Sequence, residues 1–163
     1  MSFLLIRVDD RMIHGQVVVG WANYLHPDRI VLCNDEIASN QFDKDLYESS
    51  FSDSDVSINV FSTDELLNYV KNENFNKEKC ILLLKNPKDA LKLYELNVPM
   101  NTLNIGGLHY QSQKKELNDY IFLDNNDIHC LDKLANRGIV IEGQDTPNAK
   151  KIDVMKLIHQ KLH

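Results

Sequence analysis

Short apolar runs recur along this chain, separated by segments with a helical pattern. The most apolar run is Cys80–Leu84, whose continuous CILLL sequence is typical of a strand buried on both faces of a parallel sheet. Because strands and helices alternate at short spacing, the chain is predicted to form an α/β fold. The predicted strands of this series are residues 3–8, 29–33, 56–61, 80–84 and 102–105.

Helix signals follow the predicted strands. Apolar residues at three- and four-residue spacing begin at Val17, and Asn34 is expected to cap a single helix over residues 35–51. The run Ser62-Thr63-Asp64-Glu65 has the pattern of a capping box at the start of another helix. The polar stretch 72–79 is predicted to be a loop.

The last third of the chain is less regular. Residues 120–123 and 139–141 are predicted to be short strands that pair antiparallel at a sheet edge, and a final helix is predicted from about residue 153. With 163 residues, 43% of them hydrophobic, the chain is long enough for one domain with a sizeable core. We therefore predict a single α/β domain over residues 1–163. Its central sheet is mostly parallel, with helices on both faces and a short antiparallel edge near the C-terminus.

The loop after the first predicted strand concentrates charged residues. Asp9, Asp10 and Arg11 come directly after the strand, and His14 comes just before the helical pattern. The first turn of a helix favours an anion, and Arg11 adds donors suited to phosphate. Asp9 or Asp10 is expected to hold one imidazole nitrogen of His14 and leave the other free to attack phosphorus. The competing interpretation is that His14 and Arg11 only cap a helix and form a surface ion pair.

The same stretch carries a family resemblance. Residues 7–17, RVDDRMIHGQV, followed by Trp21, closely resemble the N-terminal signature of the enzyme IIB subunit of one branch of the bacterial sugar phosphotransferase system, the mannose–fructose–sorbose family. The length of the chain and its alternation of strands and helices resemble that family along nearly the whole sequence. The resemblance implies a protein-Nπ-phosphohistidine–sugar phosphotransferase.

This resemblance also implies residue roles and partners. His14 is expected to accept the phosphoryl group through Nδ1, Arg11, Gly15 and Gln16 are expected to bind it, and no cofactor or metal is required. The expected donor is a phosphohistidine on a IIA subunit or domain. The expected acceptor is a sugar bound by the IIC and IID membrane subunits, and the family resemblance also suggests homo-oligomers.

Two further loops resemble loops of the same family. Asn104 lies near the end of the predicted strand 102–105, and Gly106 and Gly107 follow that strand. The glycines would let the backbone approach an anion closely, although a plain tight turn explains them equally well. The run Gln144–Asn148 resembles a glutamine-and-proline loop of the family only loosely. Whether this second loop contacts the site is left open by the sequence.

Net charge and composition narrow the classes of partner that this chain is expected to bind. The net charge of −6 argues against nucleic-acid binding, although Arg7 and Arg11 are expected to form a local basic patch that meets an acidic protein partner. The first strand begins without a preceding leader, and no run approaches the ~20 apolar residues that cross a membrane. We expect a cytoplasmic protein that reaches the inner face of the membrane through partner subunits. Cys33 and Cys80 lie in apolar runs and are expected to be buried.

Two other functions compete with phosphoryl transfer. The pair Asp9-Asp10 after the first strand is similar to the acidic pair that binds magnesium in receiver-like signalling domains, although Asp64 is better explained by helix capping than by a phosphoacceptor role. A regulatory binding module without transfer activity is the other alternative, and it is made less attractive by the full acceptor motif.

Overall fold

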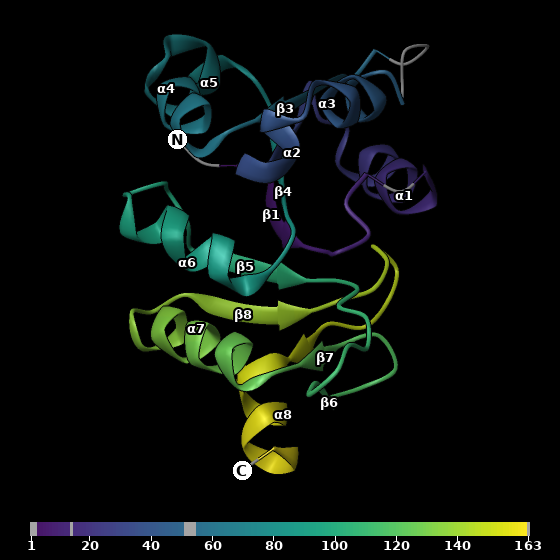
Figure 1. The fold of residues 1–163 in the computed structure, drawn as a ribbon, viewed down its shortest axis with the longest axis vertical. Coiled ribbons are helices and arrows are strands. Elements are labelled where there is room, and N and C mark those ends of the chain that lie inside the picture. The colour runs from purple at the N-terminus through teal and green to yellow at the C-terminus, as the bar shows by residue number, and fades with distance from the viewer. Residues whose placement is uncertain (1–2, 14, 51–54, 163) are drawn as a thin grey trace.

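A central sheet organises the structure, a computed structural model that describes residues 3–13, 15–50 and 55–162, with the backbone alone for 15–17 (Figure 1). In sheet order the strands are β3 (Ser57–Phe61), β2 (Arg29–Cys33), β4 (Cys80–Leu84), β1 (Leu5–Val8), β5 (Thr102–Ile105), β8 (Val140–Gly143) and β9 (Ile152–Asp153). Neighbouring strands are parallel except β8 and β9, which are antiparallel. The predicted α/β fold with a mostly parallel sheet is confirmed.

Helices cover both faces of this sheet. One face is covered by α4 (Thr63–Lys71), α5 (Glu73–Lys77), α6 (Pro87–Glu95), α7 (Asn125–Asn136) and α8 (Val154–Lys161). The other face carries α1 (Gly15–Leu25), α2 (Asp35–Ser39) and α3 (Gln41–Glu48). In Figure 1, α6 and α7 lie on the opposite side of the molecule from α1.

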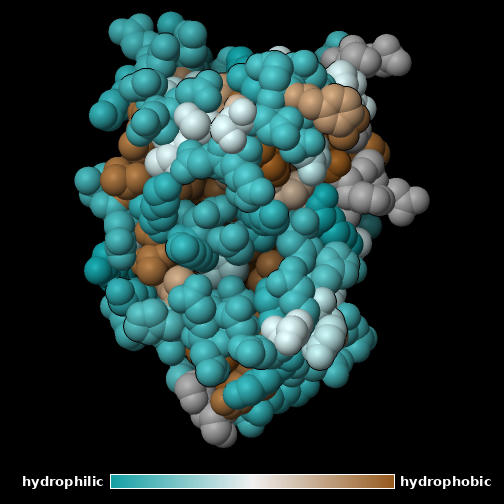
Figure 2. Space-filling view, viewed as in Figure 1, coloured by the Kyte–Doolittle hydropathy of each residue, from teal (hydrophilic) through white to brown (hydrophobic). Residues whose placement is uncertain are grey.

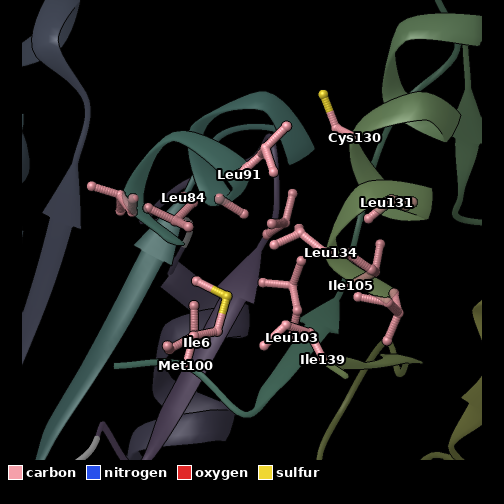
Figure 3. Packing of buried hydrophobic residues seen from close by; sticks show 14 of the residues in the cluster. Ile6, Leu84, Leu91, Met100, Leu103, Ile105, Cys130, Leu131, Leu134 and Ile139 are labelled. Atoms are coloured by element: carbon pink, nitrogen blue, oxygen red, sulfur yellow. The ribbon is translucent and has the colours of Figure 1, made fainter. Parts of the chain in front are cut away.

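Alternation of side chains along β4 explains its fully apolar sequence. Leu82 and Leu84 belong to the larger hydrophobic cluster, which α6 and α7 cover, whereas Ile81 and Leu83 belong to the cluster beneath α1. Since helices cover both faces of the strand, neither set of side chains reaches water. Figure 3 shows part of the larger cluster, in which Leu91, Leu134 and Ile105 come from two helices and a strand. Cys33 and Cys80 are buried, as predicted.

The predicted antiparallel edge exists, but other strands form it. The sequence pairs residues 120–123 with 139–141, whereas β8 lies parallel to β5 and its antiparallel neighbour is β9. Of the run 120–123, only Phe122–Leu123 (β7) is a strand, and it pairs with Lys115–Glu116 (β6) in a separate two-stranded sheet. Runs of three or four apolar residues identify short strands without specifying their partners. The two-residue strand β9 is too short to produce any such pattern.

Asparagine caps account for two further differences between the predicted and the observed helices. The helix predicted over 35–51 is two helices, because Asn40 has extended backbone angles and its side chain accepts a hydrogen bond from Asp43 N at the start of α3. The loop predicted over 72–79 contains α5, which Asn72 caps and which buries Phe75. In both places the amide side chain satisfies a helix-terminal N–H group, so helix boundaries follow the caps rather than the apolar spacing.

The face of the molecule in Figure 2 is mainly hydrophilic, with apolar side chains scattered over it. Phe42 on α3 is among the most exposed apolar residues described. Within the described ranges, no helix combines the length and the apolar character that crossing a membrane requires.

Candidate functional site

Three loops meet at the carboxyl edge of the sheet, where α/β folds bind their ligands. They follow β1, β5 and β8, and β1 lies in the interior of the sheet, between β4 and β5. Backbone hydrogen bonds tie the loops together. Asp10 N donates to Gly107 O at 2.8 Å, and Gln144 N donates to Ile105 O at 3.0 Å. The candidate site is therefore built on adjacent parallel strands rather than on one isolated loop.

Arg7 of β1 lies at the centre of this region and its side chain is fully buried. Nη1 donates to Asn104 Oδ1 and to the Gln144 carbonyl oxygen at 2.7 Å, and Nη2 donates to the Asp145 carbonyl oxygen at 2.9 Å. The guanidinium also lies 5.0 Å from the centre of the Trp21 ring, a cation–π distance. Arg7 thus joins β1, β5, α1 and the loop after β8. A surface basic patch containing Arg7 is a wrong prediction, because hydrogen bonds and burial place this charge inside the protein.

Asp9 connects the buried Arg7 to the partly exposed Arg11. Its Oδ2 accepts from Arg7 Nη2 at 3.1 Å and from Arg11 Nη2 at 2.8 Å. Its Oδ1 accepts from Arg11 Nε at 2.9 Å and from the Arg11 backbone N at 3.1 Å. Two-point pairing fixes the plane of the Arg11 guanidinium. Arg11 keeps 25% of its side chain exposed, and its Nη1 makes no hydrogen bond to a described residue.

Burial and charge oppose each other in this cluster. Burial alone raises the pKa of Asp9, but the hydrogen bond from Arg11 and the charges of Arg7 and Arg11 outweigh it and hold the pKa below its usual value. The hydrogen bond with Asp9 raises the pKa of Arg11, while burial lowers that of Arg7 against the attraction of Asp9. All three groups are therefore charged at neutral pH.

Gly106 and Gly107 lie against the two arginines. A Cβ atom on Gly106 would overlap Arg7 Nη2 and lie 2.6 Å from Asp9 Oδ2, and one on Gly107 would lie 2.7 Å from Arg11 Nε. Neither distance occurs for a real Cβ, so the loop can pack here only because these residues have no side chain. Steric fit to the arginines accounts for both glycines better than a plain tight turn does.

Asp10 holds the loop after β5 against the loop after β1. Its Oδ2 accepts from the His109 backbone N at 2.8 Å, and its Oδ1 lies 2.5 Å from His109 Nδ1. His109 is 64% exposed at the side chain. The carboxylates of Asp9 and Asp10 thus each have described partners of their own. Their predicted part in orienting His14 stays a prediction.

The two residues that precede His14 are anchored in the core. Met12 and Ile13 are buried in the cluster beneath α1, and Met12 has a φ of 58°, an uncommon backbone conformation for a residue with a side chain. Helix α1 begins at Gly15. His14 itself, and the side chains of Gly15 and Gln16, lie outside the described residues.

The loop after β8 closes the site from the side of α1. Gln144 is buried, and its Nε2 donates to the carbonyl oxygens of Pro147 and Ala149 at 3.1 and 2.9 Å. Asp145 Oδ1 accepts from Arg11 Nη2 at 3.2 Å. The loop Gln144–Asn148, whose contact with the site the sequence leaves open, therefore touches both Arg7 and Arg11.

Sequence reasoning missed the parts played by Arg7 and Asp145. The signal for Arg7 is present, since a single arginine interrupts the otherwise apolar run 3–8 and must be paired if it is buried. Asp145 has no such signal, because its contact with Arg11 joins residues 134 positions apart. Asn104, predicted as part of a site loop, is 1% exposed and acts through Arg7.

The described part of this region has the chemistry of an anion site. Its partly exposed donor is the Arg11 guanidinium, whose orientation a buried carboxylate fixes, in the loop that leads to α1. Among the described residues, no group of three or more histidine, cysteine, aspartate or glutamate side chains is arranged to hold a metal ion. The geometry fits binding of a phosphate-like group.

Comparisons with known proteins identify the family of the chain. A family model described as "PTS system sorbose subfamily IIB component" matches residues 3–163. The chain is 27% identical over 158 residues to the fructose-specific EIIB component of Bacillus subtilis (strain 168), covering 97% of this chain and 96% of that protein. It is 31% identical over 154 residues to the mannose-specific EIIAB component of Escherichia coli (strain K12), covering 94% of this chain but 47% of that protein.

Solved structures show the same fold. The IIB domain of the sorbose permease from Klebsiella pneumoniae has a TM-score of 0.92 and 28% identity, covering 99% of this chain and 98% of that one. The N-acetylgalactosamine-specific IIB component 1 from Escherichia coli has a TM-score of 0.86 and 25% identity, covering 92% of this chain and 97% of that one.

Proposed function

Because this chain belongs to the sorbose subfamily of IIB components of the sugar phosphotransferase system, we propose that it carries a phosphoryl group on His14. The observation that carries the proposal is the arrangement of Arg11, which Asp9 orients from within the protein and whose Nη1 makes no hydrogen bond to a described residue. Phosphoryl transfer requires mainly positioning and charge stabilisation from a protein.

The proposed reaction has two steps. In the first, Nδ1 of neutral His14 bonds to phosphorus while the nitrogen–phosphorus bond of the donor phosphohistidine breaks. The donor imidazole retains that electron pair and takes up a proton, and His14 releases one from Nε2. In the second, a sugar hydroxyl oxygen bonds to phosphorus, the His14 nitrogen–phosphorus bond breaks, and the hydroxyl proton passes to the imidazole.

Arg11 is the residue proposed to neutralise the oxygens in both steps. The backbone at Gly15 and Gln16, in the first turn of α1, is proposed to add N–H groups and the positive end of the helix dipole. Asp9 and Asp10 remain the proposed orienting residues, and Gly106 and Gly107 permit the close packing of the neighbouring loop. No cofactor takes part in these steps.

The proposed partners follow from the family. The phosphoryl donor is a IIA subunit or domain, and the name of the Escherichia coli EIIAB relative is consistent with such a pairing. The acceptor is a sugar held by IIC and IID membrane subunits, so we place this protein at the cytoplasmic face of the membrane. We also propose that it forms homo-oligomers and that residues 1–163 act as one domain. The names of the relatives mention fructose, mannose, sorbose and N-acetylgalactosamine.

Incubation with phosphoenolpyruvate and the upstream carrier proteins tests the proposal. The expected product is an acid-labile, alkali-stable phosphate on the wild-type protein, absent from His14→Ala. His129→Ala is the matched control, because its imidazole is exposed on α7, outside the loops that form the site, and its loss should leave the label intact. Label that persists in His14→Ala would contradict the assignment.

Other outcomes identify the competing functions. Magnesium-dependent labelling of an aspartate by acetyl phosphate would indicate a receiver-like domain. The buried Asp9, already held by two arginines, makes this outcome unexpected. Binding of partners without any label would indicate a regulatory module.

A further inference from the structure

The arginine cluster at the site is neutral only because an exposed carboxylate completes it. Arg7 and Arg11 supply two positive charges, and the buried Asp9 supplies one negative charge. The second negative charge is that of Asp145, whose side chain is 42% exposed. Without Asp145, the other three side chains together carry one net positive charge.

Asp9 and Asp145 bind different N–H groups of the Arg11 guanidinium. Nε and one Nη2 hydrogen are directed at Asp9, with distances of 2.9 and 2.8 Å. Asp145 Oδ1 lies 3.2 Å from Nη2 and accepts its second hydrogen. The remaining donors belong to Nη1. Asp9 does not bind the second Nη2 hydrogen, which an incoming anion could use. Asp145 therefore competes with such an anion for this hydrogen.

The contact between Asp145 and Arg11 is displaceable. It is a single hydrogen bond at the protein surface, whereas Asp9 makes a two-point contact from the interior. Asp145 also borders an open groove of about 430 Å³, which Trp21, Tyr24 and Pro147 help to line. Arg7 holds the Asp145 carbonyl oxygen at 2.9 Å, so the carboxylate can rotate away while the backbone of the loop stays in place.

We propose that Asp145 is a positioning residue that acts as a resident counter-ion of Arg11 and yields to the phosphoryl group. This inference rests on the proposed function of the site. When the site is empty, Asp145 neutralises and orients Arg11. When phosphate arrives, the like charge of Asp145 opposes it, so Asp145 lowers the affinity of the site for phosphate and favours onward transfer.

Binding of inorganic phosphate to the unphosphorylated full chain tests the inference. Isothermal titration at pH 7.5 and low ionic strength compares the wild type with Asp145→Asn, Asp145→Ala and Asp145→Glu. We expect Asn and Ala to bind phosphate about three- to fivefold more tightly, as removal of one partly exposed like charge implies, and Glu to resemble the wild type. A gain in affinity separates this role from a merely structural one, because damage to the site would weaken binding.

Asp64→Asn is the matched control. Asp64 is exposed in the first turn of α4, which follows β3, and β3 is separated from β1 by β2 and β4. Its substitution changes the net charge equally and should leave phosphate affinity unchanged. The gain in phosphate affinity of Asp145→Asn over the wild type should also shrink as salt is raised from 20 to about 300 mM, because added ions screen exposed charges.

Labelling of His14 separates failure of this inference from failure of the proposed function. A wild-type protein that accepts no phosphoryl group on His14 would overturn the proposed function and this inference with it. A wild-type protein that is labelled, combined with equal or weaker phosphate binding by Asp145→Asn, would overturn the role of Asp145 alone. An equal gain in Asp64→Asn would also overturn it, since the effect would then be one of net charge.

Discussion

Two arginine clusters lie at opposite ends of the same parallel sheet. At the amino end, Arg29 of β2 pairs with Glu78 through Nε and Nη2 at 2.8 and 3.0 Å, and its guanidinium lies 5.7 Å from the centre of the Tyr69 ring. At the carboxyl end, Arg7 lies over Trp21, and both Arg7 and Arg11 bind Asp9. Both clusters use an aromatic ring and two-point pairing, so neither of these features alone identifies a functional site.

The difference lies in how each cluster is neutralised. Arg29 and Glu78 balance one to one, and the Tyr69 hydroxyl donates to Glu78 at 2.7 Å. In the carboxyl-end cluster, two arginines share one buried carboxylate, and the second carboxylate is exposed and makes a single contact. A positive charge with a displaceable partner is what an anion site needs. In the Arg29 cluster, where one carboxylate balances one arginine in a two-point pair, the interaction contributes only to stability.

The largest expected effect is a loss of stability when the arginines that lie over aromatic rings, Arg7 and Arg29, are replaced. Arg7→Met is expected to lower the free energy of unfolding by about 3–5 kcal/mol, because it removes one partner of a buried, hydrogen-bonded pair. Arg29→Met, in a cluster about one quarter exposed, is expected to cost about 1–2 kcal/mol. Urea unfolding of both variants measures this, and equal losses would show that burial of Arg7 has no special cost.

Loss of the exposed arginine should instead affect transfer. Arg11→Gln is expected to slow phosphorylation by the donor by about 10²–10³-fold, the range found when one preorganised charge-stabilising donor is removed. Arg29→Gln should change the rate less than twofold, because it lies at the other end of the strands. Initial rates of labelling with a common donor preparation measure both. A similar rate for Arg11→Gln and the wild type would contradict the role of Arg11.

Adding a methyl group at each site glycine should separate stability from binding. Gly106→Ala places its Cβ against Arg7 and Asp9 and is expected to cost about 1–3 kcal/mol in unfolding free energy. Gly107→Ala displaces the partly exposed Arg11 and should weaken binding of inorganic phosphate more than it lowers stability. Thermal unfolding and phosphate titration of the pair test this. Gly138→Ala, at a φ of 90° with no atom within 4 Å of its Cβ, is a control for backbone strain.

Lowering the pH should weaken the Asp9 cluster, and we expect this change in stability to be the smallest of the predicted effects. The folded-state pKa of Asp9 lies below its unfolded value, so the stabilisation is complete above about pH 4 and is lost as pH falls through the folded pKa. The stability difference between the wild type and Asp9→Asn should therefore decrease by on the order of 1 kcal/mol between pH 6 and pH 2. Urea unfolding at several pH values measures it. A difference that grows in acid would contradict the direction of the pKa shift.

The sequence predicts the fold well where patterns are long. The runs that became β2 and β4 have the predicted bounds, because a buried parallel strand shows itself as a continuous apolar run. The edge strand β9 has two residues, too few for any pattern to show. Boundaries set by Asn40 and Asn72 depend on cap hydrogen bonds that apolar spacing does not report.

For the site, local sequence identifies Asp9 and Arg11, since they act within one loop. Asn104 and Asp145 reach the same cluster from other strands through Arg7 and Arg11, and no pattern within the sequence indicates those pairings. Long-range contacts of this kind are settled by topology, which short-range patterns do not encode.

Arg7 is near the start of the chain, while the carbonyl groups of Gln144 and Asp145 that it binds come 137 and 138 positions later. A ribosome-bound nascent chain that has not yet released these residues lacks those two acceptors for the Arg7 guanidinium. The network around Arg7 and Arg11 is therefore completed only after the loop that follows β8 has been made and β8 has docked beside β5. A product that ends before Asp145 would lack one acceptor of Arg7 and the second carboxylate of Arg11.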